Sequence, residues 1–251
     1  MQTSTRSAAR DRAKSLTVSD LETLCARVVS RVQRAFATLV PRPIQPLPRR
    51  TLARGTSGRI TLALSQLRCE EALGPRPSEL GGLVITGVAF GDDLVPHGIG
   101  PFELAVAGTT DASLTFEPPA ELASVPVPSD SPSTISVFTV ATEAGDHATA
   151  GKVTAILELA TRLLQHEARQ TNRQLAAKDA LTVLAHVYAQ TASIGGSGLY
   201  GSHVLIPDTA RLTLPRSAEP GRVGDPCTLV WQSSGAERFA EYRAEILWTL
   251  H

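Results

Sequence analysis

The sequence predicts an α+β protein with a mainly antiparallel β body of about eight strands, sandwich-like or jelly-roll-like. We also expect a helical insertion near 148–192 and a basic helical arm at the N-terminus. Short segments in which apolar and polar residues alternate recur along the chain, as in half-buried strands. Two long segments whose apolar residues repeat at helical spacing follow one another directly. Because helices and strands do not alternate along the chain, repeated βαβ units are not expected.

Charge is divided unequally along the chain. Residues 1–69 contain 13 Lys and Arg but three Asp and Glu, whereas residues 70–251 contain 11 basic and 21 acidic residues. The formal net charge of zero therefore hides two parts of opposite sign. Twelve of the 13 basic residues are Arg, whose planar guanidinium binds phosphate through paired hydrogen bonds. This asymmetry is typical of an arm that contacts a polyanion and a body that does not.

The charge division leads to two predicted parts, a basic arm at 1–58 and an α+β body at 59–251. In the arm, Ser19 and Glu22 form an S-x-x-E capping box, and the apolar residues that follow repeat at helical spacing. The proline-rich segment 41–50 predicts an extended, stiff spacer after this helix. Because the spacer can carry the helix away from the body, we expect a neighbouring subunit, rather than the chain's own body, to cover its apolar face.

Segments rich in apolar residues predict the strands of the body. In the first of them, Ile60, Leu62 and Leu64 alternate with smaller or polar residues. Further strands are expected at 83–90, 102–108, 112–117, 134–141, 203–206, 210–214 and 227–232. The Pro- and Ser-rich stretch 118–133 interrupts this series and predicts a long loop.

Two helical segments make up the predicted insertion. Apolar residues repeat at helical spacing from about 148 to 170, and a second stripe runs from Ala177 to Tyr188. The last element, 236–249, is predicted as a short helix, because its large apolar residues are three and four positions apart.

Eleven basic residues of the arm and its junction with the body are candidates for binding nucleic acid. They are Arg6, Arg10, Arg12, Lys14, Arg27, Arg31, Arg34, Arg49, Arg50, Arg54 and Arg59. Arg27, Arg31 and Arg34 stand at i, i+4 and i+7, so they form one stripe on the predicted helix. Taken by itself, such a stripe is explained by a solvated polar face of the helix. Basic segments flank it on both sides, however, and this favours a role in binding. The set predicts contacts that neutralise phosphates without reading sequence.

Three motifs are similar to catalytic or nucleotide-binding sequences, and each has a simpler explanation. The tripeptide Gly91-Asp92-Asp93 resembles the metal-binding motif of viral RNA polymerases, but the chain is too short for a polymerase and a turn explains these residues. Residues 145–153 resemble a phosphate-binding loop, but five residues separate the glycines and Val153 replaces the hydroxyl. The G-x-G-x-x-G at 196–201 follows a helix and precedes a strand, the reverse of the dinucleotide-binding order.

Cysteine and histidine give no sign of a metal site. The three cysteines lie far apart without a C-x-x-C, and no pair of the six histidines has metal-ligand spacing. We therefore expect no disulfide framework, metal, cofactor or enzymatic activity, and a reducing compartment. No apolar run reaches the roughly 18 residues that cross a membrane, so no membrane partner is expected. The Ser-, Ala- and Arg-rich N-terminus also fits an organellar transit peptide, which makes import a weaker alternative.

These observations predict a structural, self-assembling protein whose partners are copies of itself and the phosphates of RNA or DNA. The main candidate is a viral coat protein or other virion component, located in the virion or in a reducing intracellular compartment. Two alternatives remain. The basic arm of one copy could bind the acidic body of another without nucleic acid, or the chain could be a small enzyme with an unrecognised site at residues 91–93 or 145–153.

Overall fold

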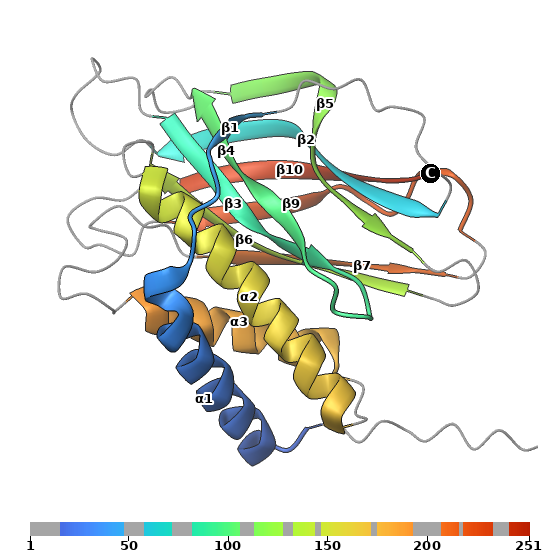
Figure 1. Cartoon of the computed structure of the whole chain (residues 1–251). Coiled ribbons are helices and arrows are strands. Elements are labelled where there is room, and N and C mark those ends of the chain that lie inside the picture. Colours follow the sequence, from blue (N-terminus) through green and yellow to red (C-terminus); the bar gives the residue numbers. More distant parts are fainter. Residues whose placement is uncertain are drawn as a thin grey trace, which may run out of the picture.

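The computed structural model describes residues 16–47, 58–71, 82–105, 113–127, 133–143, 147–171, 175–192, 207–215, 218–232 and 241–251. Within these ranges the chain forms three α-helices and ten strands, and the strands belong to two mostly antiparallel sheets (Figure 1). The α+β class and the mainly antiparallel pairing predicted from the sequence are confirmed.

The first sheet has the strand order β1-β4-β3-β6-β7. Its strands, in that order, are β1 (Gln45–Pro46), β4 (His97–Ala105), β3 (Gly82–Phe90), β6 (Ser133–Glu143) and β7 (Asp208–Leu214). Its pairs are antiparallel except that β1 lies parallel to β4. The described part of the proline-rich segment after the first helix therefore contains a short strand on the edge of this sheet.

The second sheet is antiparallel and has the order β5-β2-β10-β8, with β9 also paired to β10. Its strands are β5 (Ser113–Pro126), β2 (Arg59–Glu71), β10 (Glu241–Leu250), β8 (Gly221–Arg222) and β9 (Cys227–Gln232). The C-terminal strand β10 thus lies inside the sheet, between β2 on one side and β8 and β9 on the other.

One hydrophobic cluster contains buried side chains of both sheets. Trp231 of β9 and Trp248 of β10 lie in it together with Ile85 of β3 and Ile135 of β6. The indole N–H of Trp231 donates a hydrogen bond of 3.2 Å to the hydroxyl of Thr139 on β6, so this polar group has an acceptor inside the core. The two sheets therefore share one core.

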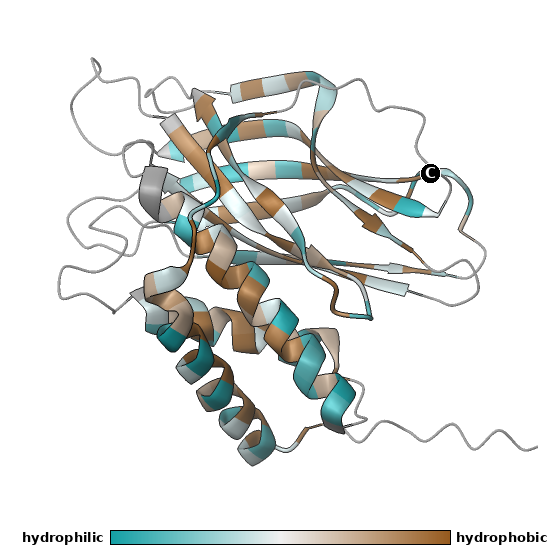
Figure 2. Ribbon diagram, viewed as in Figure 1, coloured by the Kyte–Doolittle hydropathy of each residue, from teal (hydrophilic) through white to brown (hydrophobic). Residues whose placement is uncertain are grey.

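Three helices cover the other face of the first sheet (Figure 1). They are α1 (Val18–Ala35), which continues into a 3₁₀ turn (Phe36–Thr38), α2 (His147–Thr171) and α3 (Ala177–Ala192). A second hydrophobic cluster joins these helices to Val88 of β3 and Phe138 of β6. Because successive strand residues point to opposite faces, β3 and β6 are buried on both sides. Figure 2 shows hydrophilic residues along the side of α1 that faces away from the sheet.

Most predicted elements have counterparts in the structure. The arm helix is confirmed as α1 and the helical insertion as α2 and α3. The strands expected near 60–65, 83–90, 134–141, 210–214 and 227–232 are confirmed as β2, β3, β6, β7 and β9. The strand expected at 203–206 lies outside the described residues.

The predicted C-terminal helix is wrong, because residues 241–250 form strand β10. Tyr242, Ala244, Ile246 and Trp248 occupy alternate positions and are buried in the cluster that both sheets share. The buried residues of this segment therefore repeat every two positions, as in a strand, and not every three or four, as in a helix.

The predicted loop at 118–133 is wrong over its first half, because β5 continues to Pro126. Pro118 and Pro119 lie inside this strand. Since β5 is at the edge of its sheet, one side of it needs no hydrogen-bonding partner, and an edge strand tolerates proline for that reason. The strand predicted at 102–108 is also displaced, because β4 begins at His97.

Candidate nucleic-acid interface

Helix α1 is attached to the body by its apolar face. Cys25, Val28, Val29 and Val32 are buried and lie in the same hydrophobic cluster as α2 and α3. The expectation that a neighbouring subunit covers this face is therefore wrong, because the chain's own helices cover it. Burial also raises the pKa of the Cys25 thiol above its ordinary value, so it stays protonated and packs as a small apolar side chain.

The start of α1 is fixed by a reciprocal capping box. The hydroxyl of Thr17 accepts a hydrogen bond from the backbone N–H of Asp20, and the Asp20 carboxylate accepts one from the backbone N–H of Thr17, both at 3.2 Å. The capping box predicted at Ser19 and Glu22 is therefore displaced by two residues.

The path of the chain after α1 is fixed by contacts with α2. The backbone N–H of Arg42 donates to the carbonyl of Gly151 at 3.0 Å, and a side chain at Gly151 would collide with the Arg42 carbonyl. The Arg42 guanidinium reaches Glu158 of α2 at 2.6 Å. The described part of the segment predicted as a spacer, residues 41–47, is extended, but it lies against the body instead of leading away from it.

Two of the candidate arginines converge on one carboxylate of α2. Arg31 lies 3.0 Å from Glu167, and Arg27 lies 3.5 Å from the other oxygen of the same carboxylate. The Glu167 side chain is only 8% exposed, whereas Arg27 is 59% and Arg31 38% exposed. The two guanidiniums are therefore only partly neutralised, and both remain accessible from solvent.

Arg34 completes the stripe at the C-terminal end of α1. Its Nε donates to the backbone carbonyl of Ser30 at 3.3 Å, and its side chain is exposed. Within the described parts of the chain, no carboxylate forms an ion pair with it. Its positive charge is thus available to a ligand.

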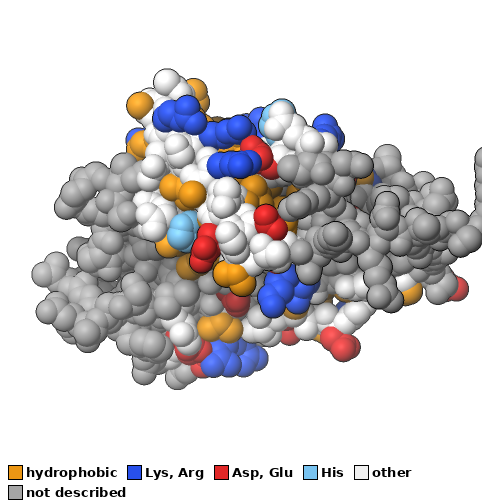
Figure 3. All heavy atoms as spheres, turned by 90° about the horizontal axis from the view of Figure 1, so that it is seen from below, with side chains coloured by type: hydrophobic (Ala, Val, Ile, Leu, Met, Phe, Trp, Pro, Cys, Tyr) orange, Lys and Arg blue, Asp and Glu red, His pale blue; other side chains and the backbone are white. Residues whose placement is uncertain are grey.

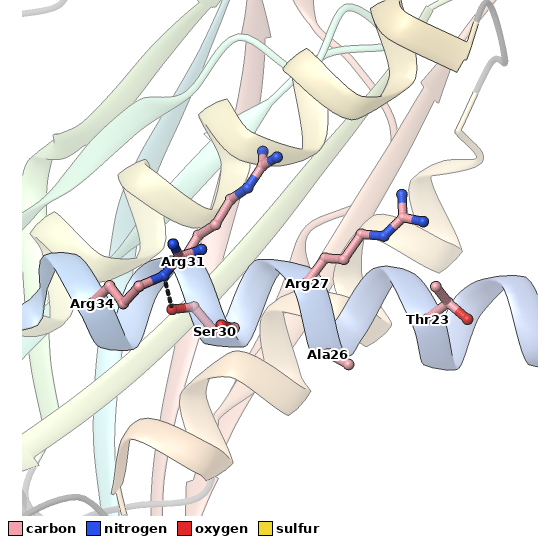
Figure 4. Close-up of a pocket in the computed structure, with 6 residues that line it drawn as sticks. All are labelled: Thr23, Ala26, Arg27, Ser30, Arg31 and Arg34. Carbon is pink, nitrogen blue, oxygen red and sulfur yellow. Dashed lines mark hydrogen bonds between the residues drawn. The ribbon is translucent and has the colours of Figure 1, made fainter.

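The three arginines border an open hollow along the outer side of α1 (Figure 4). The residues that line it are Thr23, Ala26, Arg27, Ser30, Arg31 and Arg34. Seen from the helical side, Lys and Arg side chains gather along one edge of this face (Figure 3). Guanidinium groups and hydroxyls together supply donors that suit phosphate oxygens.

The other candidates of the sequence prediction do not join this group in the described structure. Arg59 lies on β2 of the second sheet, where it donates to the hydroxyl and the carbonyl of Ser124 at 2.9 and 2.8 Å. These bonds tie β2 to β5, so its guanidinium has a structural role there. The remaining seven lie outside the described residues, namely Arg6, Arg10, Arg12, Lys14, Arg49, Arg50 and Arg54.

Glu167 is the residue of the interface that sequence reasoning missed. The chain separation between it and the arginines hides the contact from any local pattern. One signal was present: Glu167 follows Ala160 and Leu164 on the buried stripe of α2, where a carboxylate needs a cationic partner.

The turn that contains Asp92 and Asp93 connects β3 to β4. The Asp92 carboxylate accepts a hydrogen bond from the backbone N–H of Thr134 at 3.0 Å, and that of Asp93 accepts one from Val95 at 3.1 Å. The Asp93 carboxylate therefore stabilises its own turn, as the turn interpretation predicts, whereas Asp92 ties this turn to the start of β6. Across the described residues, no group of three or more His, Cys, Asp or Glu is arranged to hold a metal ion.

The segment 145–153 does not form a phosphate-binding loop in its described part. Residues from His147 onward belong to α2, Gly151 packs against the Arg42 backbone, and the Lys152 ammonium lies 5.3 Å from the ring centre of Phe36. Gly151 and Lys152 are thus inside a helix and engaged with the chain that follows α1.

We therefore expect turnover of ATP or GTP with Mg²⁺ to stay at background. The variant Lys152→Ala should give the same rate, because this ammonium packs on an aromatic ring instead of facing a phosphate site. The measurement is phosphate release over hours at saturating nucleotide. Hydrolysis that disappears in Lys152→Ala would place the protein among the enzymes.

In the described part of the chain, no helix combines the length and apolar character needed to cross a bilayer. No protein-family model matches the chain, and neither the curated proteins nor the solved structures gave a match.

Proposed function

We propose that the protein is a structural protein that binds the phosphate backbone of RNA or DNA through the basic outer face of α1 and assembles with copies of itself, as a viral coat protein does. The observation that carries the proposal is the attachment of α1. Its valines are buried against α2 and α3, so Arg27, Arg31 and Arg34 are presented from a fixed helix around an open hollow. A fixed donor array loses less conformational entropy on binding than a free tail does.

The shape of the hollow favours an extended polyanion over a small phosphate compound. From Arg27 to Arg34 the stripe covers about 10 Å of helix, at roughly 1.5 Å per residue. The hollow is open, and the basic segment 1–15 precedes the same helix. None of the described residues that line it is aromatic, so we expect no stacking of bases at this site and binding that is insensitive to sequence.

A β-sandwich body agrees with the proposed coat function. Two sheets that share one core support this architecture, of which an eight-stranded jelly roll is one version. The three cysteines are present as thiols rather than disulfides, which supports a reducing compartment, or a virion assembled in one. Association without nucleic acid, through the basic arm and the acidic body, remains the second candidate, and the same charge division supports it.

Replacing Arg27 and Arg34 together by glutamine should weaken binding of a fluorescein-labelled 20-nucleotide RNA by about tenfold or more at low salt. Both side chains are exposed on the rim of the hollow, so the fold should tolerate the change. The matched control is Arg211→Gln with Arg222→Gln, which removes the same charge from exposed positions on β7 and β8. Equal affinities for the two double variants, measured by fluorescence anisotropy, would refute the assignment of this face.

Copies of the protein should associate at low ionic strength and separate as salt is added. The basic and acidic parts of the chain attract one another across molecules, and this attraction is screened within about 10 Å at 0.1 M salt. Static light scattering over a wide range of protein concentration measures the mass. A monomer at every concentration in low salt would contradict the assembly part of the proposal.

A further inference from the structure

We propose that Glu167 divides the arginine face of α1 into a fixed residue and two ligand-facing residues. Arg31 stays on Glu167 and holds α1 to α2, whereas Arg27 leaves this carboxylate to bind a phosphate group alongside Arg34. Glu167 is then a built-in competitor for the phosphate backbone, and it sets how much of the arginine charge a nucleic acid can use. This inference rests on the proposed function.

The geometry of the two ion pairs supports the division. Arg31 is the closer partner of Glu167, at 3.0 Å against 3.5 Å for Arg27. It is also the less exposed of the two, at 38% against 59%. A close, less exposed pair holds two helices together more strongly than a longer, more exposed pair, because water and salt screen the latter more.

The burial of Glu167 explains why one arginine must stay. A carboxylate that is 8% exposed is costly to leave without a cation, so losing both arginines to a phosphate group is less favourable than losing one. Releasing Arg27 leaves Glu167 with Arg31, and that exchange keeps the buried carboxylate compensated.

The exposed side of α1 supports Arg27 and Arg34 as the ligand-facing pair. Both are exposed and border the hollow, with the hydroxyl-bearing residues Thr23 and Ser30 between or beside them. In Figure 4 the Arg27 and Arg31 side chains extend to the same side of α1, while Arg34 lies beside Ser30. A phosphate at the hollow can therefore recruit Arg27 by rotation of a side chain, without movement of the helix.

The test compares Arg27→Gln, Arg31→Gln and Glu167→Gln in the full chain. Each variant is titrated with the labelled 20-nucleotide RNA at several salt concentrations, and its urea unfolding midpoint is measured separately. Arg27→Gln should weaken binding severalfold and reduce the salt slope by about 0.7, the value for one phosphate on a single strand, with the unfolding midpoint unchanged. Arg31→Gln should lower the unfolding midpoint and leave the salt slope unchanged.

Glu167→Gln should strengthen binding severalfold, because it removes the competing carboxylate while keeping its shape. The control for net charge is Glu103→Gln, an exposed residue of β4, which should leave the affinity within about twofold. Two results would overturn the division of roles while leaving the proposed function intact. One is that Arg27→Gln and Arg31→Gln lose binding equally and have equal unfolding midpoints. The other is that Glu167→Gln binds RNA more weakly than the unaltered protein. Failure of the unaltered protein to bind RNA would instead refute the proposed function, and the role of Arg27 with it.

Discussion

Raising the salt concentration from 50 to 200 mM should weaken binding of RNA or double-stranded DNA by the full chain by about 10³- to 10⁵-fold. Ten basic candidates remain when Arg59, which is bonded to Ser124, is set aside, and about six to ten phosphates are expected to be engaged at once. Each contact releases condensed counterions, so the affinity depends steeply on salt. The expected slope of log affinity against log salt is the most sensitive sign of a backbone-binding protein.

Fluorescence anisotropy at four or more salt concentrations measures this slope. RNA and DNA of unrelated sequences should give similar affinities, because the described lining of the hollow on α1 offers donors for phosphate and contains no aromatic ring for bases. An affinity that changes less than about threefold over the same salt range would show that phosphate contacts do not drive binding.

Val32→Asp should lower the free energy of unfolding by about 3–5 kcal/mol. Val32 is fully buried in the cluster that joins α1 to α2 and α3, and a carboxylate there has neither solvent nor a cation in the apolar face. The matched control is Val18→Asp. Val18 is 76% exposed at the first position of α1, where a negative charge suits the helix dipole, so its change should stay within about 0.5 kcal/mol.

Urea unfolding followed by circular dichroism compares the two variants. The contrast tests whether α1 belongs to the body in solution. If both variants unfold at the same urea concentration as the unaltered protein, α1 is a detachable arm, and the fixed arginine face on which the proposed function depends does not exist.

The sequence-based prediction of β10 failed for a physical reason. Tyr242, Ile246 and Leu250 fit a helical spacing, and Tyr242, Ala244, Ile246 and Trp248 fit a strand. Local spacing cannot decide between them in so short a segment. The long-range pairing of this segment with β2 decides it, and that pairing joins the two ends of the body.

The prolines of β5 show the same limit. Pro118 and Pro119 argue against a strand with neighbours on both sides, so the sequence predicts a loop there. A strand at the edge of a sheet tolerates proline. Whether a segment lies at the edge depends on the sheet topology, which a single sequence does not reveal. The strands with strong apolar patterns, such as β3 and β6, could be predicted because burial on both faces leaves a continuous signal.

The candidate site could be predicted in part. The stripe of Arg27, Arg31 and Arg34 follows from helical spacing alone, and the structure places it on one accessible face. The cover of α1 could not be predicted, because its valines pack against α2 and α3, which are far away in the sequence. A stiff spacer led to the wrong expectation that a neighbouring subunit covers the apolar face of α1, since a stiff segment can also run along the body.

The most direct test of the proposed function is to locate the bound nucleic acid on the chain. The protein is irradiated with ultraviolet light in complex with the 20-nucleotide RNA, and cross-linked peptides are identified by mass spectrometry. We expect cross-links in peptides from residues 1–38, which contain the outer face of α1. Unlabelled RNA should compete for these cross-links, and their yield should fall as the salt concentration rises. Cross-links confined to strands of the second sheet, such as β2, β5 or β10, with none in residues 1–38, would contradict the proposed function.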